Sequence, residues 1–394
     1  MSVGRGGVPQ LEPPMMLDAH ILLNVCGTAL AAVAMCYMIA AAVALRVRRA
    51  PAHRGLVAAP PTTILKPLCG AEHELYERLR SFCEQNCARL QIICGVRDRD
   101  DPALGAVRRL QREFPHLDLQ IAANPAQHGT SGKVSNLVNM MPLARHDYLV
   151  IADGDIRVTP GYLERVIAPL LDEKVGIVTC LYSGLPLPGR WSLLGSLFIN
   201  EWFMPAVRVA ALFGSRSFAF GATIAVRRET LARIGGFGSI ADQLPDDYRL
   251  GELTRRMGLR TVLSEVEVET CVEETSPGDL VRHELRWLRT IRTVQPFGYA
   301  LAGITVGVPA AIVGSVLAGG SGVTLAMVAA TAVARLMIHS APRKPYSPLA
   351  QLWLVALNDL LVFALWCWSF TTRQVYWRQV RYRVARDGTA HPVP

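Results

Sequence analysis

Residues 148–157 read YLVIADGDIR, a short apolar run that ends in two aspartates separated by one glycine. The run has the composition of a buried strand, and ligands in an open parallel sheet bind at the carboxyl ends of the strands. We therefore expect Asp153 and Asp155 to point into a cleft. Two carboxylates at this spacing suit a divalent cation, Mg²⁺ or Mn²⁺, whose other ligands come from substrate phosphates. Group transfer from a nucleotide diphosphate donor is the simplest chemistry for such a site.

Strand-like and helix-like segments alternate around this stretch, which predicts an α/β fold with a doubly wound, mostly parallel sheet. Strands are expected near 62–65, 90–96, 117–122, 148–152 and 175–180, and helices near 72–86, 103–114, 133–143 and 162–171. The same domain continues through 218–227, helices at 228–234 and 248–257, two short strands within 260–272 and a helix at 277–291.

The chain is too apolar for an ordinary soluble domain. It has 394 residues, of which 51% are hydrophobic and 19% are charged. One soluble domain with several membrane segments fits this composition better. The apolar stretch 17–45 is long enough to span a bilayer, and the arginines within 46–49 follow it directly. The positive-inside rule then places the following residues in the cytoplasm, so we expect a membrane anchor in 1–50 and a linker at 51–61.

A second apolar region covers 297–371. Segments near 298–318, 321–340 and 349–370 each look able to span a bilayer, and a basic tail follows at 372–394. Four spans in all would place this tail outside the cytoplasm, which positive-inside statistics disfavour. Either one late segment does not cross, or the tail is an exception. Asn358 and Asp359 lie inside the last segment, where a functional role and a hydrated structural contact both remain open.

Residues 191–213 are also apolar, but they include Asn200, Glu201, Pro205 and Arg208. A crossing here would put Asp153 and the acids at 246–247 on opposite sides of the membrane. We therefore expect an amphipathic or re-entrant segment that lies on the membrane face. Such a segment could admit a lipid acceptor.

The formal net charge of +9 raises the question of nucleic-acid binding. The arginines, however, gather beside apolar runs, as in RVRR at 46–49 and RQVYWRQVRYR at 373–383. This placement favours anionic lipid headgroups, and we expect no nucleic-acid partner. The nine cysteines include no CxxC pair, and Cys83 and Cys87 lack a second pair that would complete a zinc site. Reduced thiols are the expectation.

Three other places carry candidate site residues. Asp98 and Asp101 follow the strand near 90–96, where an acidic turn could hold the base or ribose of a nucleotide. A solvated turn capped by Asp101 explains the same residues equally well. Lys133 begins a predicted helix and could neutralise a diphosphate. Asp246 and Asp247 open another helix, where they could cap its first turn or supply a general base.

The helix at 277–291 presents a polar face formed by His283, Arg286, Trp287 and Thr290, which are spaced three, four and seven apart. An indole there could form a wall for an acceptor or a sugar, and a guanidinium could bind a leaving diphosphate through two hydrogen bonds. A basic helix that lies against lipid headgroups is the alternative, and the two roles are compatible.

Six motifs occur in order: LKPLCG (65–70), VRDRDDP (96–102), GKVSNL (132–137), DGDIRV (153–158), DDYRLG (246–251) and HELRW (283–287). In this order they resemble the ceramide glucosyltransferase family of GT-A glycosyltransferases (families 21 and 2). The resemblance runs from about Thr62 to about Pro296. Within the family, HELRWLRTIR (283–292) and GATIAVRRETLARIGGF (221–237) look most like bacterial hopanoid-biosynthesis glycosyltransferases.

The resemblance implies a GT-A catalytic domain at 62–296 with an interfacial helix at 191–213, flanked by the N-terminal anchor and by C-terminal transmembrane helices. It also implies roles for single residues. Asp101, with Asp98 beside it, matches the first family acid, Asp153 the second and Asp247 the third, which is the expected base. Arg286 and Trp287 match the end of a (Q/R)xxRW motif and, with Lys133, are expected on the donor side. Asp246 and His283 are expected on the acceptor or leaving-group side, although His283 departs from the motif.

The implied activity is inverting transfer of a sugar from a UDP-sugar to a lipid hydroxyl in a bacterial inner membrane, with a divalent cation. The first expectation is N-acetylglucosamine passed from UDP-GlcNAc to the side-chain hydroxyl of bacteriohopanetetrol, and the second is glucose passed to ceramide. A processive polysaccharide synthase is a further alternative. His283 weakens it, because such a synthase would favour glutamine at this first position of the (Q/R)xxRW motif. A membrane protein that binds a UDP-sugar without turnover is another.

Overall fold

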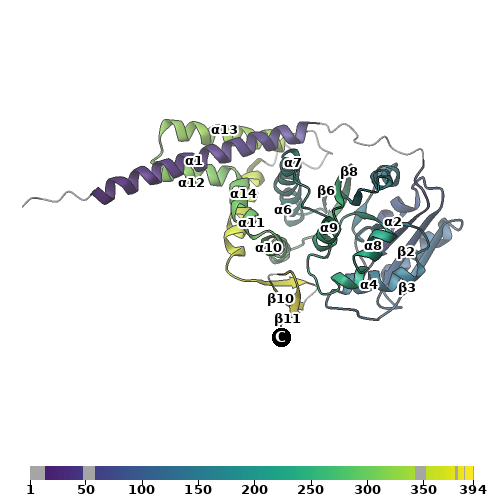
Figure 1. The fold of residues 1–394 in the computed structure, drawn as a ribbon. Coiled ribbons are helices and arrows are strands. Elements are labelled where there is room, and N and C mark those ends of the chain that lie inside the picture. The colour runs from purple at the N-terminus through teal and green to yellow at the C-terminus, as the bar shows by residue number, and fades with distance from the viewer. Residues whose placement is uncertain (1–13, 48–57, 342–351, 378–379, 386, 394) are drawn as a thin grey trace, which may run out of the picture.

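The computed structural model describes residues 14–47, 58–341, 352–377, 380–385 and 387–393. An α/β domain lies beside a group of apolar helices, and a small C-terminal sheet lies below them (Figure 1). Most of the expected linker at 51–61 falls outside the described residues. All nine cysteines are free, as expected for reduced thiols.

The centre of the domain is an eight-stranded sheet with the strand order β3-β2-β1-β4-β7-β6-β8-β5. The pairs β1–β2, β2–β3, β1–β4 and β6–β8 are parallel. The mostly parallel sheet predicted from the sequence is therefore confirmed. Its strands are β1 (Thr62–Pro67), β2 (Leu90–Val96), β3 (Asp118–Ala123), β4 (Tyr148–Ile151), β5 (Ile156–Arg157), β6 (Val175–Pro186), β7 (Ile224–Arg227) and β8 (Arg260–Val272).

Two details of the sheet differ from the prediction. Strand β7 runs antiparallel to both of its neighbours, β4 and β6. Residues 260–272 form the single long strand β8 instead of two short strands, and β8 pairs with β6 along most of its length. The pairing between β6 and β8 is irregular near Thr179 and Leu181. This irregularity lies where the sequence pattern suggested a boundary between two short strands.

Helices cover both faces of the sheet, so its central strands are apolar on both sides. In β4, Val150 packs into the larger core cluster, whereas Leu149 and Ile151 pack into a second cluster on the other face. Because both sides of β4 are buried, its carboxyl end is fixed and the following DGD turn is held at one edge of the sheet. The domain helices are α2 (Leu75–Cys83), α3 (Ala103–Glu113), α4 (Gly132–Met140), α5 (Tyr162–Ile167), α8 (Arg228–Arg233), α9 (Asp246–Arg256) and α10 (Pro277–Val294).

Residues 190–212 form three consecutive helical pieces: α6 (Arg190–Leu197), the π-helix η3 (Phe198–Phe203) and α7 (Met204–Leu212). The widened turn of η3 lies against the domain, where the ring of Phe203 packs against Tyr182 of β6 at 5.2 Å between centroids. At the end of α7, Phe213 is 82% exposed. A buried face with large exposed apolar residues at its end is consistent with the predicted amphipathic segment, whose place on a membrane stays a prediction.

In the part of the chain that the structure describes, three helices are long and apolar enough to cross a membrane: α1 (Pro14–Arg46) over residues 19–46, α13 (Gly322–His339) and α14 (Leu352–Ser369). The expected segment near 298–318 is instead broken, because α11 (Pro296–Leu301) and η5 (Ala302–Val306) meet α12 (Val308–Leu317) at an angle of 86°. Helices α12 and α13 lie alongside α1 (Figure 1). Glycines allow this packing: a Cβ added to Gly27 would lie 2.5 Å from the Gly314 carbonyl oxygen.

The C-terminal residues return to the α/β domain. Strands β9 (Gln374–Trp377), β10 (Val380–Val384) and β11 (Ala390–Pro392) form a small antiparallel sheet. The Leu244 N–H donates to the Gly388 carbonyl (3.1 Å), and the Ala390 N–H donates to the Asp242 carbonyl (2.9 Å). Helix α10 and this sheet thus both contact the α/β domain, and the number of late crossings stays a prediction with its two alternatives.

Candidate active site

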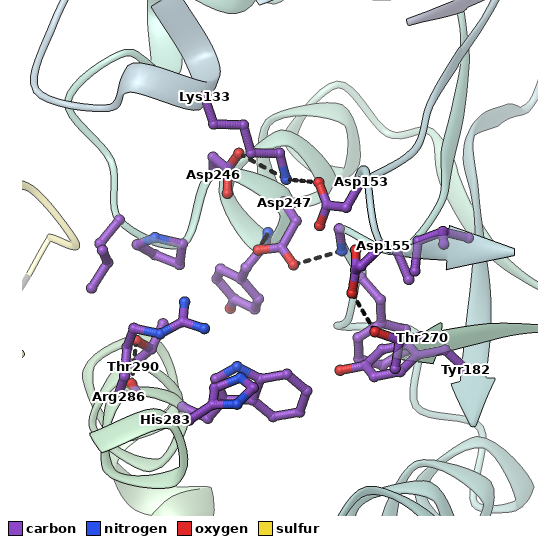
Figure 2. A pocket seen from close by; sticks show the side chains of 18 of the residues that line it. Lys133, Asp153, Asp155, Tyr182, Asp246, Asp247, Thr270, His283, Arg286 and Thr290 are labelled. Carbon is purple, nitrogen blue, oxygen red and sulfur yellow. Dashed lines mark hydrogen bonds and ion pairs between the residues drawn. The ribbon is translucent and has the colours of Figure 1, made fainter. Parts of the chain in front are cut away.

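A cavity of about 1480 Å³ opens at the carboxyl edge of the sheet. Its polar part is shown in Figure 2, where side chains from the DGD turn, α4, α9 and α10 face one another. Every residue that the sequence analysis assigned to the site lies on the wall of this cavity: Asp98, Asp101, Lys133, Asp153, Asp155, Asp246, Asp247, His283, Arg286 and Trp287. The structure therefore brings these separated motifs together.

Lys133 joins two of the acidic turns. Its Nζ lies 2.6 Å from Asp153 Oδ1 and 3.5 Å from Asp246 Oδ2. Burial by itself would lower the pKa of Lys133, but the carboxylates of Asp153 and Asp246 outweigh it and raise that pKa above its usual range. The side chain is therefore a permanent cation, and it is paired rather than a lone surface lysine. Ser131 positions it by capping α4 through a hydrogen bond from the Val134 N–H (3.3 Å).

Asp247 is held as a hydrogen-bond acceptor at the start of α9. Its Oδ2 accepts the Gly221 N–H (2.8 Å) and its Oδ1 accepts the Tyr248 N–H (2.7 Å). Burial, with Asp246 as the next cause, raises the pKa of Asp247 to about 6. The bond from the Tyr248 N–H satisfies an amide in the first turn of α9, as the helix-capping alternative expects. Asp247 also lies on the wall of the cavity (Figure 2), so the structure is compatible with both alternatives.

Side chains from two strands of the sheet hold the DGD turn in place by hydrogen bonds. Lys66 is fully buried in β1, and its Nζ donates a hydrogen bond to the Asp153 carbonyl. Burial lowers the pKa of Lys66 to about 8. The hydroxyl of Thr270, on β8, donates to Asp155. Burial, with Asp153 as the next cause, raises the pKa of Asp155. The sequence analysis missed Lys66, although a single lysine within the apolar strand TTILKP was a signal for it.

Glu72 is a second missed residue. It follows β1 and lies against the DGD turn: a Cβ added to Gly154 would lie 2.5 Å from Glu72 Oε2. That oxygen is buried and has no hydrogen-bond partner among the described residues. Burial, and then Asp155, raises the pKa of Glu72 to about 7. The signal was available, because an acid that follows a strand end next to β4 is expected at the same edge of the sheet.

The polar face predicted for α10 is confirmed, since His283, Arg286, Trp287 and Thr290 all line the cavity. Trp287 is also part of the core, with its ring 5.9 Å from Tyr182 and 5.7 Å from Phe203 between centroids. Burial lowers the pKa of Arg286, although neighbouring carboxylates oppose this change. Nδ1 of His283 hydrogen-bonds with the Glu274 carboxylate, which fixes the orientation of the ring.

Asp98 and Asp101 form the turn predicted after β2. The Asp101 carboxylate accepts the Gly70 N–H (2.9 Å) and the Ala103 N–H (2.9 Å), so it ties the loop after β1 to the start of α3. Asp98 accepts the Asp100 N–H (3.0 Å). This is the capped turn that the sequence left as one alternative. Both residues also line the cavity, so the structure retains the nucleotide alternative as well.

The acids of the site can supply only some of the ligands that a divalent cation needs. In the described part of the chain, no group of three or more His, Cys, Asp or Glu side chains could hold a metal ion by itself. Asp153 and Asp155 offer carboxylates, and Glu72 Oε2 is an orphaned acceptor beside them. Mg²⁺ and Mn²⁺ suit such a site when phosphate oxygens and waters complete the shell. The donor set therefore fits a cation that arrives with a diphosphate.

The other half of the cavity is apolar. It runs between η3–α7 on one side and α10–α11–η5 on the other, where the Trp202 Nε1–H donates to the Thr305 hydroxyl (2.9 Å). We call this half the apolar arm, and its lining is Ile199, Trp202, Phe203, Ala206, Val207, Ala210, Phe218, Phe220, Ile291, Val294, Gly298, Ala302 and Thr305. Phe213, which follows α7, and Phe297, which precedes the lining residue Gly298, are 82% and 79% exposed. One cavity thus joins a charged end to an apolar end.

We predict that Lys133→Met destabilises the protein by about 2–3 kcal/mol at pH 7, because two partly buried carboxylates lose their cation. Asp153 keeps 35% of its side chain exposed, which limits the loss. The deficit should shrink as the pH falls towards 5, because the carboxyl groups then gain protons. Thermal unfolding in detergent at several pH values measures it. Lys174→Met, at an exposed surface position, is the control; an equal loss in both variants would contradict the pairing.

The fold and the sequence have known relatives. Ceramide glucosyltransferase 1 of Caenorhabditis elegans is 22% identical over 206 residues, which are 52% of this chain and 44% of that protein. Ceramide glucosyltransferase of Komagataella phaffii is 32% identical over 112 residues, which are 27% and 22% of the two chains. The chain thus spans less than half the length of these curated relatives. Of the solved structures, the mannosyltransferase PcManGT from Pyrobaculum calidifontis, in complex with GDP-Man and Mn²⁺, has a TM-score of 0.54 at 20% identity, and covers 88% of this chain and 97% of that one.

The structural likeness to PcManGT shows a shared fold, which agrees with the GT-A architecture expected from the motifs. The family model described as glycosyl transferase family 21 matches residues 26–390, so the match includes the apolar helices on both sides of the α/β domain. Because it covers nearly the whole sequence, the chain belongs to glycosyl transferase family 21.

Proposed function

We propose that this protein transfers a sugar from a UDP-sugar to a hydroxyl group of a membrane lipid, with inversion at the anomeric carbon. The observation that carries the proposal is the continuity of the cavity. Its charged end has the acids and cations that a sugar-nucleotide diphosphate requires, and its apolar arm is lined by α7 and η5, which pack against helices that are long enough to cross a membrane. A water-soluble acceptor would have no use for the apolar arm.

The size of the cavity supports two ligands. Pockets for one small ligand are about 300–1,000 Å³, whereas this cavity has about 1480 Å³. A UDP-sugar would occupy the charged end, and the apolar arm would receive the body of a lipid. The exposed rings of Phe213 and Phe297 would lie at the membrane surface, where aromatic side chains are favoured. The proposal thus gives a role to each half.

The donor would lie between the acidic turns and α10. Asp98 and Asp101 face the nucleotide end, and Arg286 can bind the diphosphate with two hydrogen bonds. Lys133 adds a second cation on the opposite side. Trp287 forms a wall for the sugar. The residues we assign to the donor are Asp98, Asp101, Lys133, Asp153, Arg286 and Trp287.

A divalent cation, Mg²⁺ or Mn²⁺, would be held by Asp153 and Asp155. When bound, it supplies positive charge to the diphosphate leaving group. Glu72 lies beside the same turn and could accept a hydrogen bond from a sugar hydroxyl. Asp246 and His283 lie towards the acceptor and the leaving group, and Glu274 keeps the imidazole of His283 oriented.

Asp247 is the proposed general base. It accepts the proton of the lipid hydroxyl while that oxygen attacks the anomeric carbon, and the bond to the UDP oxygen breaks on the opposite face. The N–H of Gly221 holds one carboxylate oxygen in place. Gly221 lies close to the site, since an added Cβ would lie 3.2 Å from both Asp153 Oδ2 and Lys133 Nζ, and these two side chains would have to shift by a few tenths of an ångström.

Two acceptors are candidates. The segments HELRWLRTIR (283–292) and GATIAVRRETLARIGGF (221–237) support N-acetylglucosamine transfer to a hopanoid polyol such as bacteriohopanetetrol. The names of the curated relatives support glucose transfer to ceramide. In either case we propose that the domain faces the cytoplasm of a bacterium and that the apolar helices hold it at the inner membrane. Positive charge at Arg46 and after residue 372 supports that orientation.

The direct experiment incubates the purified full chain in lipid nanodiscs with UDP-GlcNAc or UDP-glucose, a divalent cation, and either a hopanoid polyol or ceramide. Mass spectrometry of the extracted lipid should show one added sugar on one of the two acceptors. A series of products with many sugars would indicate a processive synthase. Binding of a UDP-sugar with no lipid product from any combination would contradict the proposal.

We predict that Asp247→Asn lowers kcat about 10²–10⁴-fold, which is the usual contribution of a positioned general base. Binding of UDP, measured by calorimetry, should change little, because the amide can still accept the Gly221 N–H. Asp172→Asn serves as the control, since it removes a surface ion pair with Arg260 and lies outside the cavity lining. Full activity of Asp247→Asn would remove it from the base role.

We also predict that kcat/KM falls as the pH drops through about 6. The raised pKa of Asp247 means that its carboxylate gains a proton there, and a protonated carboxyl group cannot accept the lipid proton. Activity is therefore present above this pH and lost below it. Initial rates between pH 5 and pH 8, with a stability control at each pH, measure the profile. A flat profile across pH 6 would contradict this assignment.

A further inference from the structure

A cluster of buried charged side chains lies outside the cavity, at the junction of the apolar helices with the domain. The guanidinium of Arg335, on α13, binds the carboxylate of Asp359, on α14, with Nε–O distances of 2.9 and 3.0 Å. Its Nη1 also donates to Glu201 Oε2 on η3 at 2.7 Å. Nδ1 of His339 lies 2.8 Å from the other oxygen of Glu201. Three helices that are distant in sequence therefore meet at one guanidinium.

The cluster is almost completely inaccessible to solvent. The exposed fractions are 6% for Glu201, 4% for Arg335, 4% for His339 and 8% for Asp359. Charges in such surroundings are costly unless they are paired, and removal of one partner from a buried ion pair typically costs about 3–5 kcal/mol. Apolar side chains would have packed α13 against α14 without this cost. The retained charges therefore point to a geometric role, because paired charges fix direction as well as contact.

Glu201 lies in the middle of the π-helix η3, and its neighbours point in different directions. Ile199, Trp202 and Phe203 line the apolar arm. Asn200 turns to β6, where its side chain accepts the Gly184 N–H (2.8 Å) and donates to the Gly184 carbonyl (2.9 Å). Glu201 points to α13, where it contacts Arg335 and His339. A π-helical turn is an uncommon, widened turn that often marks a functional site, and here both of its polar side chains hold it in place.

The rings beside Glu201 are connected to the catalytic end of the cavity. Trp202 hydrogen-bonds to Thr305 across the apolar arm (2.9 Å). The ring of Phe203 packs against Trp287, whose neighbour in sequence is Arg286. A shift of η3 would therefore move one wall of the arm, whereas the DGD turn and α4 have separate supports in Lys66 and Ser131.

We propose that the cluster of Glu201, Arg335 and Asp359 is a positioning device that sets the width of the apolar arm and so determines how the lipid acceptor binds. The inference rests on the proposed function, because the arm is taken as the acceptor site. None of the three residues lines the cavity. They act through Trp202 and Phe203 and are positioning residues rather than catalytic ones.

The test compares KM for the lipid acceptor with KM for the UDP-sugar in the full-length protein in nanodiscs. Glu201→Gln should raise the acceptor KM about tenfold or more, because an amide cannot replace the charge-assisted hydrogen bonds to Arg335 and His339. The UDP-sugar KM should stay within about twofold, since the donor end has its own supports. Asp118→Asn is the matched control, because it removes an ion pair with Arg145 (3.0 Å) and does not line the cavity.

A second variant separates geometry from stability. The triple variant Glu201→Met, Arg335→Met and Asp359→Leu replaces the cluster with apolar side chains, which often keeps or raises stability. We expect it to unfold near the wild-type temperature and still to show the raised acceptor KM. If Glu201→Gln does not fold, the acceptor KM of this triple variant tests the proposal instead.

Three outcomes would overturn the inference. An acceptor KM equal to wild type in both variants would show that the cluster does not set the arm. Equal rises in both KM values, together with a lower unfolding temperature, would show a purely structural role. Absence of lipid product from the wild-type protein would overturn the proposed function, and the inference with it, and this result is distinct from the first two.

Discussion

The site depends on one partly buried cation. Lys133, at the start of α4, lies between Asp153 at the end of β4 and Asp246 at the start of α9, and it allows carboxylates from distant parts of the chain to share one cavity. Without a cation, acids at this distance would repel one another and retain protons. The fold holds both partners in place: β4, which precedes Asp153, is buried on both faces, and α4, which carries Lys133, is capped by Ser131. The charge balance of the site is thus set before any ligand binds.

A second constraint comes from the apolar half of the cavity. The charged end follows from strand ends in an α/β sheet, but the arm is built from a helical segment that turns through a π-helix at Glu201. The same segment contacts the sheet, the late helices and the cavity, so it links the catalytic domain to the apolar helices. The C-terminal sheet closes this arrangement by hydrogen-bonding to the loop before Asp246. The proposed membrane helices and the acidic site are therefore one structural unit.

The sequence predicted what local patterns determine. An apolar run that ends in DGD, and polar residues spaced three and four apart on a helix, specify a strand end and a helix face without reference to the rest of the chain. The direction of β7 and the long strand β8 depended on pairing with β6, which no local pattern encodes. The partners of Glu201 were missed for the same reason, since they lie far away in sequence. Lys66 and Glu72 were missed although the sequence held a signal for each, a lysine inside an apolar strand and an acid after a strand end. Asp101 was left with two alternatives, and its contacts with Gly70 and Ala103 are compatible with both.

The most direct test of the account is a cryo-electron microscopy map of the full chain in lipid nanodiscs with UDP, Mn²⁺ and a lipid acceptor analogue. The account predicts density for the diphosphate between Asp153 and Arg286, an ion next to Asp153 and Asp155, and lipid density in the arm beside Trp202. The acceptor hydroxyl should lie within hydrogen-bonding distance of Asp247. Nucleotide bound elsewhere, or an apolar arm that is filled by side chains while lipid binds at another surface, would contradict it.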